Sequence, residues 1–242
     1  MKEKQSIILF STSDSNPAAE FAQYISQRFS RKLIILGTGN TEYDRQSLKP
    51  DRDFAEALIR EFDPVMIVFS YAVEKTVQRK NIRKILLAFR DLRIPYVGVS
   101  ESCEFAGTVS KVMVPVGFLT EEKEKAPWSN SFIKYCGAEI TLLKPKDRGS
   151  RAARNVDFIA KFLKTQKNSC TIVNGEKSSF KIEFEALEKF SHETDMLIIS
   201  ASRAYGLDDD IFGPKEYHVL RKSNRPVLII NPRDDIYVLC GD

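Results

Sequence analysis

The chain has 242 residues, of which 43% are hydrophobic and 10% aromatic, so it can supply a substantial core and has room for two domains. Its 37 Lys and Arg residues against 33 Asp and Glu give a net charge of only +4, which disfavours a dedicated nucleic-acid-binding surface. Four scattered cysteines without a CxxC pair, together with only two histidines, argue against a zinc site and against a disulfide framework.

The first part of the chain alternates buried strands with amphipathic helices. An apolar run at 7–10 predicts a strand, and Ser15-Asn-Pro17 predicts the start of a helix. Lys32–Leu36, Val65–Phe69 and Pro95–Val99 predict three further strands with helical patterns between them. The opening apolar run is too short for a signal peptide or a membrane span, so we expect no membrane association and a cytoplasmic protein with reduced thiols.

The pattern restarts with a strand at Lys111–Val116 and a second strand at Ala138–Leu143. Ala152–Val173 then contains a helix and a strand that have no counterpart in the first part. Phe180–Phe184 alternates like a strand, which leaves the start of the following helix open.

The end of the chain predicts one right-handed parallel crossover. Asp195–Ser200 and Arg225–Ile230 are buried strands, and the helix between them is expected from Asp210 to Asn224. Such a unit belongs to a parallel sheet that is covered by helices on both faces.

A comparison of spacings indicates that the second half repeats the first with an addition. Ser13 and Gly117, which close the first strands, lie 104 residues apart, whereas Pro95 and Pro226, which open the last strands, lie 131 apart. The surplus of 27 residues is about one helix and one strand. We therefore predict an α/β chain of two tandem doubly wound parallel-sheet domains, 1–104 and 105–242, each with its own sheet and the first one shortened.

Over nearly its whole length the chain resembles the universal stress protein family, some members of which are tandem. The resemblance is closest in Val112-Met-Val-Pro-Val116, in Gly137-Ala-Glu-Ile-Thr-Leu-Leu143 and in the terminal crossover. It implies the three-layer α/β/α fold of the adenine nucleotide alpha hydrolase type and a role in the stress response. In nucleotide-binding members, the last crossover holds the phosphates of ATP with its loop and the start of its helix.

The residues that would hold a nucleotide are mostly replaced. The family's first strand ends in an aspartate that contacts adenosine, and the matching residue is Gly117. The family's phosphate motif is Gly, two residues, Gly, nine residues, then Gly-Ser or Gly-Thr, and the matching positions hold Ser200, Arg203, Gly213 and Pro214. Proline removes both the hydroxyl and an N–H donor from the helix start. The equivalent count in the first half gives Phe69, Ala72, Ile82 and Arg83, without any glycine.

We therefore expect a non-enzymatic stress-protein-like module that acts through self-association or a protein partner and that has lost nucleotide binding, with no cofactor and no metal. The alternative is a sensor that binds AMP, ATP or another anion through the second half. Its candidate ligand-binding residues are Gly117, Ser200, Arg203, Gly206 and Gly213. An ATP-using enzyme of a related fold is disfavoured, because a fold does not provide chemistry without a site.

The two halves of the chain are expected to associate with each other. The final strand in this family is an edge strand that commonly pairs with its counterpart, so the strands that open at Pro95 and Pro226 are predicted to pair with each other. A further homodimer is left open. The apolar stretch Ile236–Leu239 is predicted to pack as a short strand or cover on an exposed edge.

Overall fold

A computed structural model describes residues 5–10, 17–36, 52–72, 76–146, 150–202 and 213–232. The elements of the first half are β1 (Ser6–Phe10), α1 (Pro17–Arg28), β2 (Lys32–Leu36), α2 (Arg52–Phe62), β3 (Pro64–Tyr71), α3 (Thr76–Phe89) and β4 (Tyr96–Ser100). Those of the second half are β5 (Lys111–Pro115), the 3₁₀ helix η1 (Thr120–Glu124), α4 (Lys125–Cys136), β6 (Glu139–Lys144), α5 (Ser150–Thr165), β7 (Thr171–Asn174), α6 (Ile182–Phe190), β8 (Met196–Ser200), α8 (Lys215–Lys222) and β9 (Val227–Ile230).

The nine strands form one sheet in the order β2-β1-β3-β4-β9-β8-β5-β6-β7. All neighbouring strands are parallel except β4 and β9, which pair antiparallel through Tyr96 with Ile229, Val97 with Leu228 and Gly98 with Val227. The α/β class is confirmed. The expectation of two separate sheets is wrong, because the last strand of each half pairs with the other and makes the sheet continuous.

The two halves are locked together over this strand pair. A Cβ atom at Gly98 would lie 2.5 Å from Leu220 Cδ2, so the lack of a side chain at Gly98 lets Leu220 of α8 pack this closely on β4. The Tyr71 hydroxyl donates to the Leu220 carbonyl at 2.6 Å. Asn231, just after β9, donates from its side chain to the carbonyls of Phe89 and Leu92. Each of these contacts joins one half to the other.

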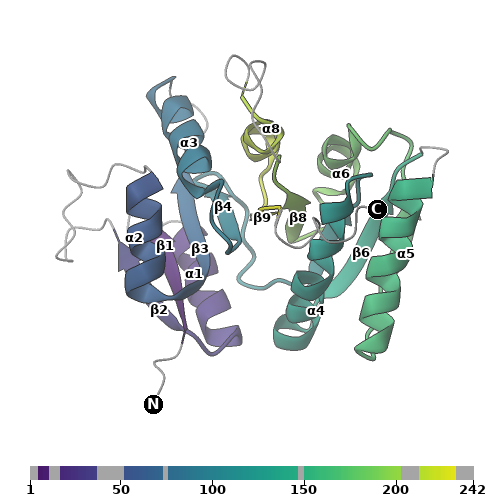
Figure 1. Cartoon of the computed structure of the whole chain (residues 1–242), viewed down its shortest axis with the longest axis horizontal. Helices are drawn as coiled ribbons and strands as arrows, with labels where there is room; N and C mark the ends of the chain where they lie inside the picture. The colour runs from purple at the N-terminus through teal and green to yellow at the C-terminus, as the bar shows by residue number, and fades with distance from the viewer. Residues whose placement is uncertain are drawn as a thin grey trace, which may run out of the picture.

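Both faces of the sheet are covered by helices, which gives three layers (Figure 1). Side chains alternate along each strand, so Ile7 and Leu9 enter one core while Ile8 enters the other. The first core packs under α1, α4 and α5, and the second under α2, α3, α6 and α8. Each core takes residues from both halves. In the first core, the ring centroids of Phe29, just after α1, and Tyr135 of α4 lie 4.7 Å apart.

The additional helix and strand of the second half are α5 and β7, where the sequence indicated a surplus. Phe180–Phe184 is not a strand, because α6 begins at Ile182. The last crossover helix begins at Lys215, later than expected, since Pro214 is extended at its N-cap. The division into 1–104 and 105–242 stays a prediction. No helix in the described ranges has the length and apolar character needed to cross a membrane.

Candidate functional site

The carboxyl edge of β5 and β8 brings two of the predicted site residues to the same end of the sheet. The two strands are parallel neighbours, so Gly117, two residues past β5, and Ser200, the last residue of β8, lie at one edge. Gly213 precedes α8, which follows β8 along the chain. Arg203 and Gly206 lie outside the described residues.

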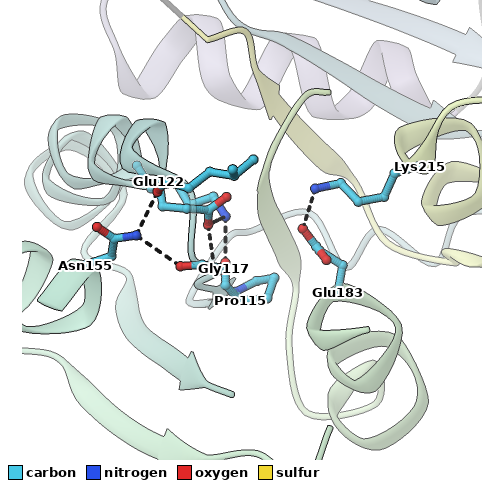
Figure 2. Close-up of polar contacts among 8 residues, drawn as sticks. Pro115, Gly117, Glu122, Asn155, Glu183 and Lys215 are labelled. Atoms are coloured by element: carbon cyan, nitrogen blue, oxygen red, sulfur yellow. Dashed lines mark hydrogen bonds and ion pairs between the residues drawn. The ribbon is translucent and has the colours of Figure 1, made fainter. Parts of the chain in front are cut away.

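The loop after β5 is held by a buried ion pair (Figure 2). The Gly117 N–H donates to Glu122 Oε2 at 2.7 Å, and the same oxygen accepts from Lys125 Nζ at 2.6 Å. Lys125 also donates to the Pro115 carbonyl at 2.6 Å. Both charged side chains are buried, with exposed fractions of 2% for Glu122 and 0% for Lys125. From α5, Asn155 donates to the Gly117 carbonyl at 3.0 Å.

The environment of Glu122 keeps it ionised. Burial would raise the pKa of this carboxyl group, but the ammonium groups of Lys125 and Lys215 and the Gly117 N–H outweigh that effect and hold the pKa below its ordinary value. The family resemblance places an aspartate at Gly117. Here a carboxylate from η1 approaches that position, because Glu122 Oε1 lies 3.4 Å from where a Cβ of residue 117 would be.

The loop after β8 is held by a second buried carboxylate. The Ser202 N–H donates to Glu216 Oε1 at 2.9 Å, and the Ser202 hydroxyl donates to Glu216 Oε2 at 2.9 Å. Glu216 lies in the first turn of α8 and is fully buried. The Glu216 carboxylate therefore accepts from two donors of this loop. In the nucleotide-binding proteins that the sequence resembles, the corresponding loop holds phosphate.

The loop after β7 repeats the arrangement. The N–H groups of Glu176 and Lys177 donate to the Glu185 carboxylate, the latter at 2.7 Å. Glu185 lies in the first turn of α6 and is 1% exposed. Burial would raise the pKa of Glu185, but these N–H groups and Lys189 hold it below its ordinary value.

Three loops at the carboxyl edge thus share one hydrogen-bonding arrangement. After β5, β7 and β8, backbone N–H groups donate to a carboxylate of the helix that follows: Glu122 of η1, Glu185 of α6 and Glu216 of α8. Such N–H groups are what binds phosphate at this edge of α/β proteins. The chain supplies its own anions at these three places.

Lys215 joins α8 to α6 at this edge. Its ammonium donates to Glu183 Oε1 at 2.7 Å, which connects α8 to α6 (Figure 2). Burial would lower the pKa of Lys215, but Glu183 and Glu122 raise it above its ordinary range. Lys215 therefore stays charged and balances the surrounding carboxylates.

The glycine that matches the phosphate motif has a local structural reason. Gly213 has φ of +90°, and a Cβ atom there would lie 2.6 Å from Tyr217 Cδ1. Only glycine fits this backbone conformation and this contact. The residue is thus required by the turn into α8, whether or not a phosphate binds.

The equivalent positions of the first half do not form a phosphate loop in the described residues. Phe69 and Ile82 are buried core residues, with exposed fractions of 0% and 1%. Across the described ranges, no group of three or more His, Cys, Asp or Glu side chains is placed to hold a metal ion.

Sequence reasoning missed the six charged residues that build the edge: Glu122, Lys125, Glu183, Glu185, Lys215 and Glu216. Charged residues in a helix are ordinarily solvent-exposed, so their sequence positions gave no reason to place them inside. A usable signal exists, since η1, α6 and α8 each follow a strand and a loop and each carry Glu in the first turn.

Comparisons with known proteins agree with this fold. No protein-family model matches the chain, and no curated protein sequence matches it significantly. Among solved structures, a universal stress protein from Archaeoglobus fulgidus DSM 4304 superposes with a TM-score of 0.64 at 13% identity, over 96% of this chain and 98% of that one.

Two further structures are similar over the same extent. A protein of unknown function from Pseudomonas aeruginosa PAO1 has a TM-score of 0.63 at 16% identity, over 98% of this chain and 95% of that one. A proposed universal stress protein from Pseudomonas aeruginosa UCBPP-PA14 has a TM-score of 0.59 at 15% identity, over 98% of this chain and 96% of that one. At these identities the likeness concerns the fold: a sheet of mostly parallel strands flanked by helices, as in the universal stress protein structures.

Proposed function

We propose that this chain is a non-enzymatic, universal stress protein-like module of the stress response that acts through self-association or a protein partner and no longer binds adenine nucleotide. The observation that carries the proposal is the set of three carboxylates at the carboxyl edge. Glu122, Glu185 and Glu216 accept the loop N–H groups that a phosphate would need. A bound triphosphate would have to displace them against like charge.

The same carboxylates are poor candidates for catalysis. Glu122 is engaged by an ammonium group and Glu216 by two donors of one serine. The pKa values of Glu122 and Glu185 lie below the ordinary range, whereas a general base at neutral pH works best with a pKa near 7. These groups therefore support a structural role rather than proton transfer.

The outer edge of β7 is a surface through which two copies of the chain could associate. β7 pairs only with β6, so its other edge is open among the described strands. The four residues Thr171–Asn174 carry no charge, and Ile172 is 45% exposed. Edge strands without charges are the ones that pair with other chains. β7 is the place where we expect a second copy to add.

The nucleotide content of the purified protein tests the proposal. The full chain is denatured, and the released small molecules are separated by anion-exchange chromatography with detection at the absorbance of adenine. We expect no adenine nucleotide. A stoichiometric amount of AMP or ATP would overturn the proposal in favour of the nucleotide-binding sensor.

A further inference from the structure

The outward face of α5 is a surface with no part in the carboxylate arrangement. α5 belongs to the addition that the first half lacks, and it lies at the outer end of the second half (Figure 1). Its apolar side packs into the first core through Val156, Ile159 and Leu163. Its other side carries exposed side chains. We define the α5 face by four of them: Arg151, Arg154, Phe158 and Lys161.

The cations of α5 have no acidic partners. Four of them are exposed and form no ion pair within the described residues: Arg151, Arg154, Lys161 and Lys164. Asp157 is the one acidic residue of the helix. On α6, by contrast, Lys189 Nζ lies 2.6 Å from a carboxylate oxygen of Glu176. The positive charge of α5 is therefore not balanced within its own surface.

Phe158 lies among these cations and is 43% exposed. Arg154 precedes it by four positions and Lys161 follows it by three, so both are neighbours on the helix surface. From η1, Lys123 Nζ lies over the Phe158 ring, 5.1 Å from its centroid. Single exposed apolar side chains are common, but this one adds an apolar contact to a region of positive potential.

The 3₁₀ helix η1 contributes only a cation to this face. Glu121 and Glu122 are buried, with exposed fractions of 1% and 2%, whereas Lys123 extends to Phe158. The acidic side chains of this region thus lie inside the molecule and the basic ones outside. A partner of opposite charge would meet little repulsion here.

Two classes of acidic partner fit this face poorly. A basic helix binds a membrane by inserting its apolar side, but the apolar side of α5 is already in the core. A base of a single-stranded nucleic acid stacks on an aromatic ring, but Lys123 lies over the Phe158 ring, and the net charge of the chain is only +4. An acidic protein segment needs only carboxylates and a small apolar side chain.

We infer that the α5 face binds an acidic segment of a protein partner. Carboxylates of the segment pair with Arg154 and Lys161, and an aliphatic side chain contacts Phe158. The inference rests on the proposed function, because it names the chemistry of a partner through which the chain acts. The face is separate from β7, where a second copy is expected.

Fluorescence anisotropy with a fluorescein-labelled peptide of Glu-Glu-Leu repeats tests the inference on the full chain. At low ionic strength we expect saturable binding with a Kd on the order of 0.1 mM. The double variant Arg154→Gln with Lys161→Gln should weaken it by about fivefold to tenfold, and Phe158→Ser by about fivefold. A peptide of Gln-Gln-Leu repeats should not bind, and salt should weaken the binding of the acidic peptide.

Matched variants in the first half are the controls. Arg60→Gln with Lys84→Gln removes one arginine and one lysine from exposed positions on α2 and α3. Leu87→Ser removes another exposed apolar side chain, which is 51% exposed. Both control variants should bind the acidic peptide as the wild type does. Thermal melting verifies that each variant folds, and either α5 variant is sufficient if the other does not.

Two results would overturn the inference: no saturable binding by the wild type, or equal losses in the α5 variants and their controls. Tighter binding of oligodeoxythymidine, or of phosphatidylserine vesicles, through the same residues would also overturn it, because the partner would then be a nucleic acid or a membrane. The proposed function is tested separately. Adenine nucleotide in the purified protein refutes that function even if the peptide binds, whereas failure of the peptide alone refutes only the role of the α5 face.

Discussion

The carboxylate of Glu216 accepts hydrogen bonds from both the N–H and the hydroxyl of Ser202, each at 2.9 Å. This contact closes the loop after β8 onto the first turn of α8. In an α/β protein that binds a nucleotide, a loop N–H and a serine hydroxyl at this place face a phosphate. Here a fully buried side chain of the same protein accepts from these donors.

Removal of the Glu216 carboxylate should lower the stability of the protein and free the Ser202 donors to bind an anion. Glu216→Ala leaves the Ser202 donors without an acceptor, and we expect a loss of ~1.5–3 kcal/mol in the free energy of unfolding. Added inorganic phosphate should then raise the Tm of Glu216→Ala more than that of the wild type. Glu193→Ala, which removes an exposed carboxylate, is the control and should respond as the wild type does. Equal phosphate responses in all three proteins would show that Glu216 does not stand in for an anion.

The buried pair of Glu122 and Lys125 should be sensitive to the loss of one partner. Lys125→Met leaves a buried carboxylate unpaired, so the free energy of unfolding should fall by about 3–5 kcal/mol. Replacing both residues, as in Glu122→Leu with Lys125→Met, should recover part of that loss, because no unpaired charge remains. Urea denaturation measures both changes. A double variant that is no more stable than Lys125→Met would contradict this account of the pair.

Acid should destabilise the chain through the same carboxylates. The pKa values of Glu122 and Glu185 are lower in the folded chain than the ordinary value of 4.5, so the unfolded chain takes up protons first as the pH falls. Their contribution to stability is complete above about pH 5 and is lost as the pH falls through the folded values.

Glu185→Gln removes one of these groups. Its free energy of unfolding, measured by urea denaturation at several pH values, should therefore depend less steeply on pH below about 5. Glu193→Gln, at an exposed position, is the control. A Glu185→Gln variant with the pH dependence of the wild type would show that Glu185 is not among the groups responsible.

Self-association through β7 predicts a concentration-dependent sedimentation coefficient for the wild type. Ile172→Lys places a charge on the open edge and should leave a monomer. Leu87→Lys replaces another exposed apolar side chain, 51% exposed on α3, and should associate as the wild type does. A wild type that is monomeric at every concentration, or an Ile172→Lys variant that associates unchanged, would exclude this edge.

The sequence was sufficient for the strands, since their apolar runs are long and their spacing repeats. It also indicated the strands that open at Pro95 and Pro226 as a pair, and β4 and β9 do pair. That pairing by itself makes one continuous sheet, so the expectation of two separate sheets was inconsistent with it. What the sequence could not indicate is how closely the two halves pack across the pair. The packing of Gly98 against Leu220 is of this kind.

The site was less accessible to sequence reasoning. The candidate residues Ser200 and Gly117 lie at the same end of neighbouring strands, but whether they bind a ligand stays a prediction. A comparison with the family's motif shows only which of its residues are missing. It does not show that Glu122 and Glu216 have taken over the freed donors. Pro214 was recognised as incompatible with the phosphate motif, and it is the extended N-cap of α8. Predictions for Arg203, Gly206 and the tail 234–242 concern residues outside the described ranges.

The central claim is that the chain's own carboxylates have replaced the phosphates of a nucleotide, and calorimetry with MgATP on the full wild-type chain tests it most directly. Each donor lost to Glu122, Glu185 or Glu216 removes roughly 1.5–3 kcal/mol from phosphate binding, so two or three lower the affinity by orders of magnitude. We predict no binding in the low-micromolar range and no preference for MgATP over magnesium tripolyphosphate. Low-micromolar binding that requires the adenine base would contradict the account.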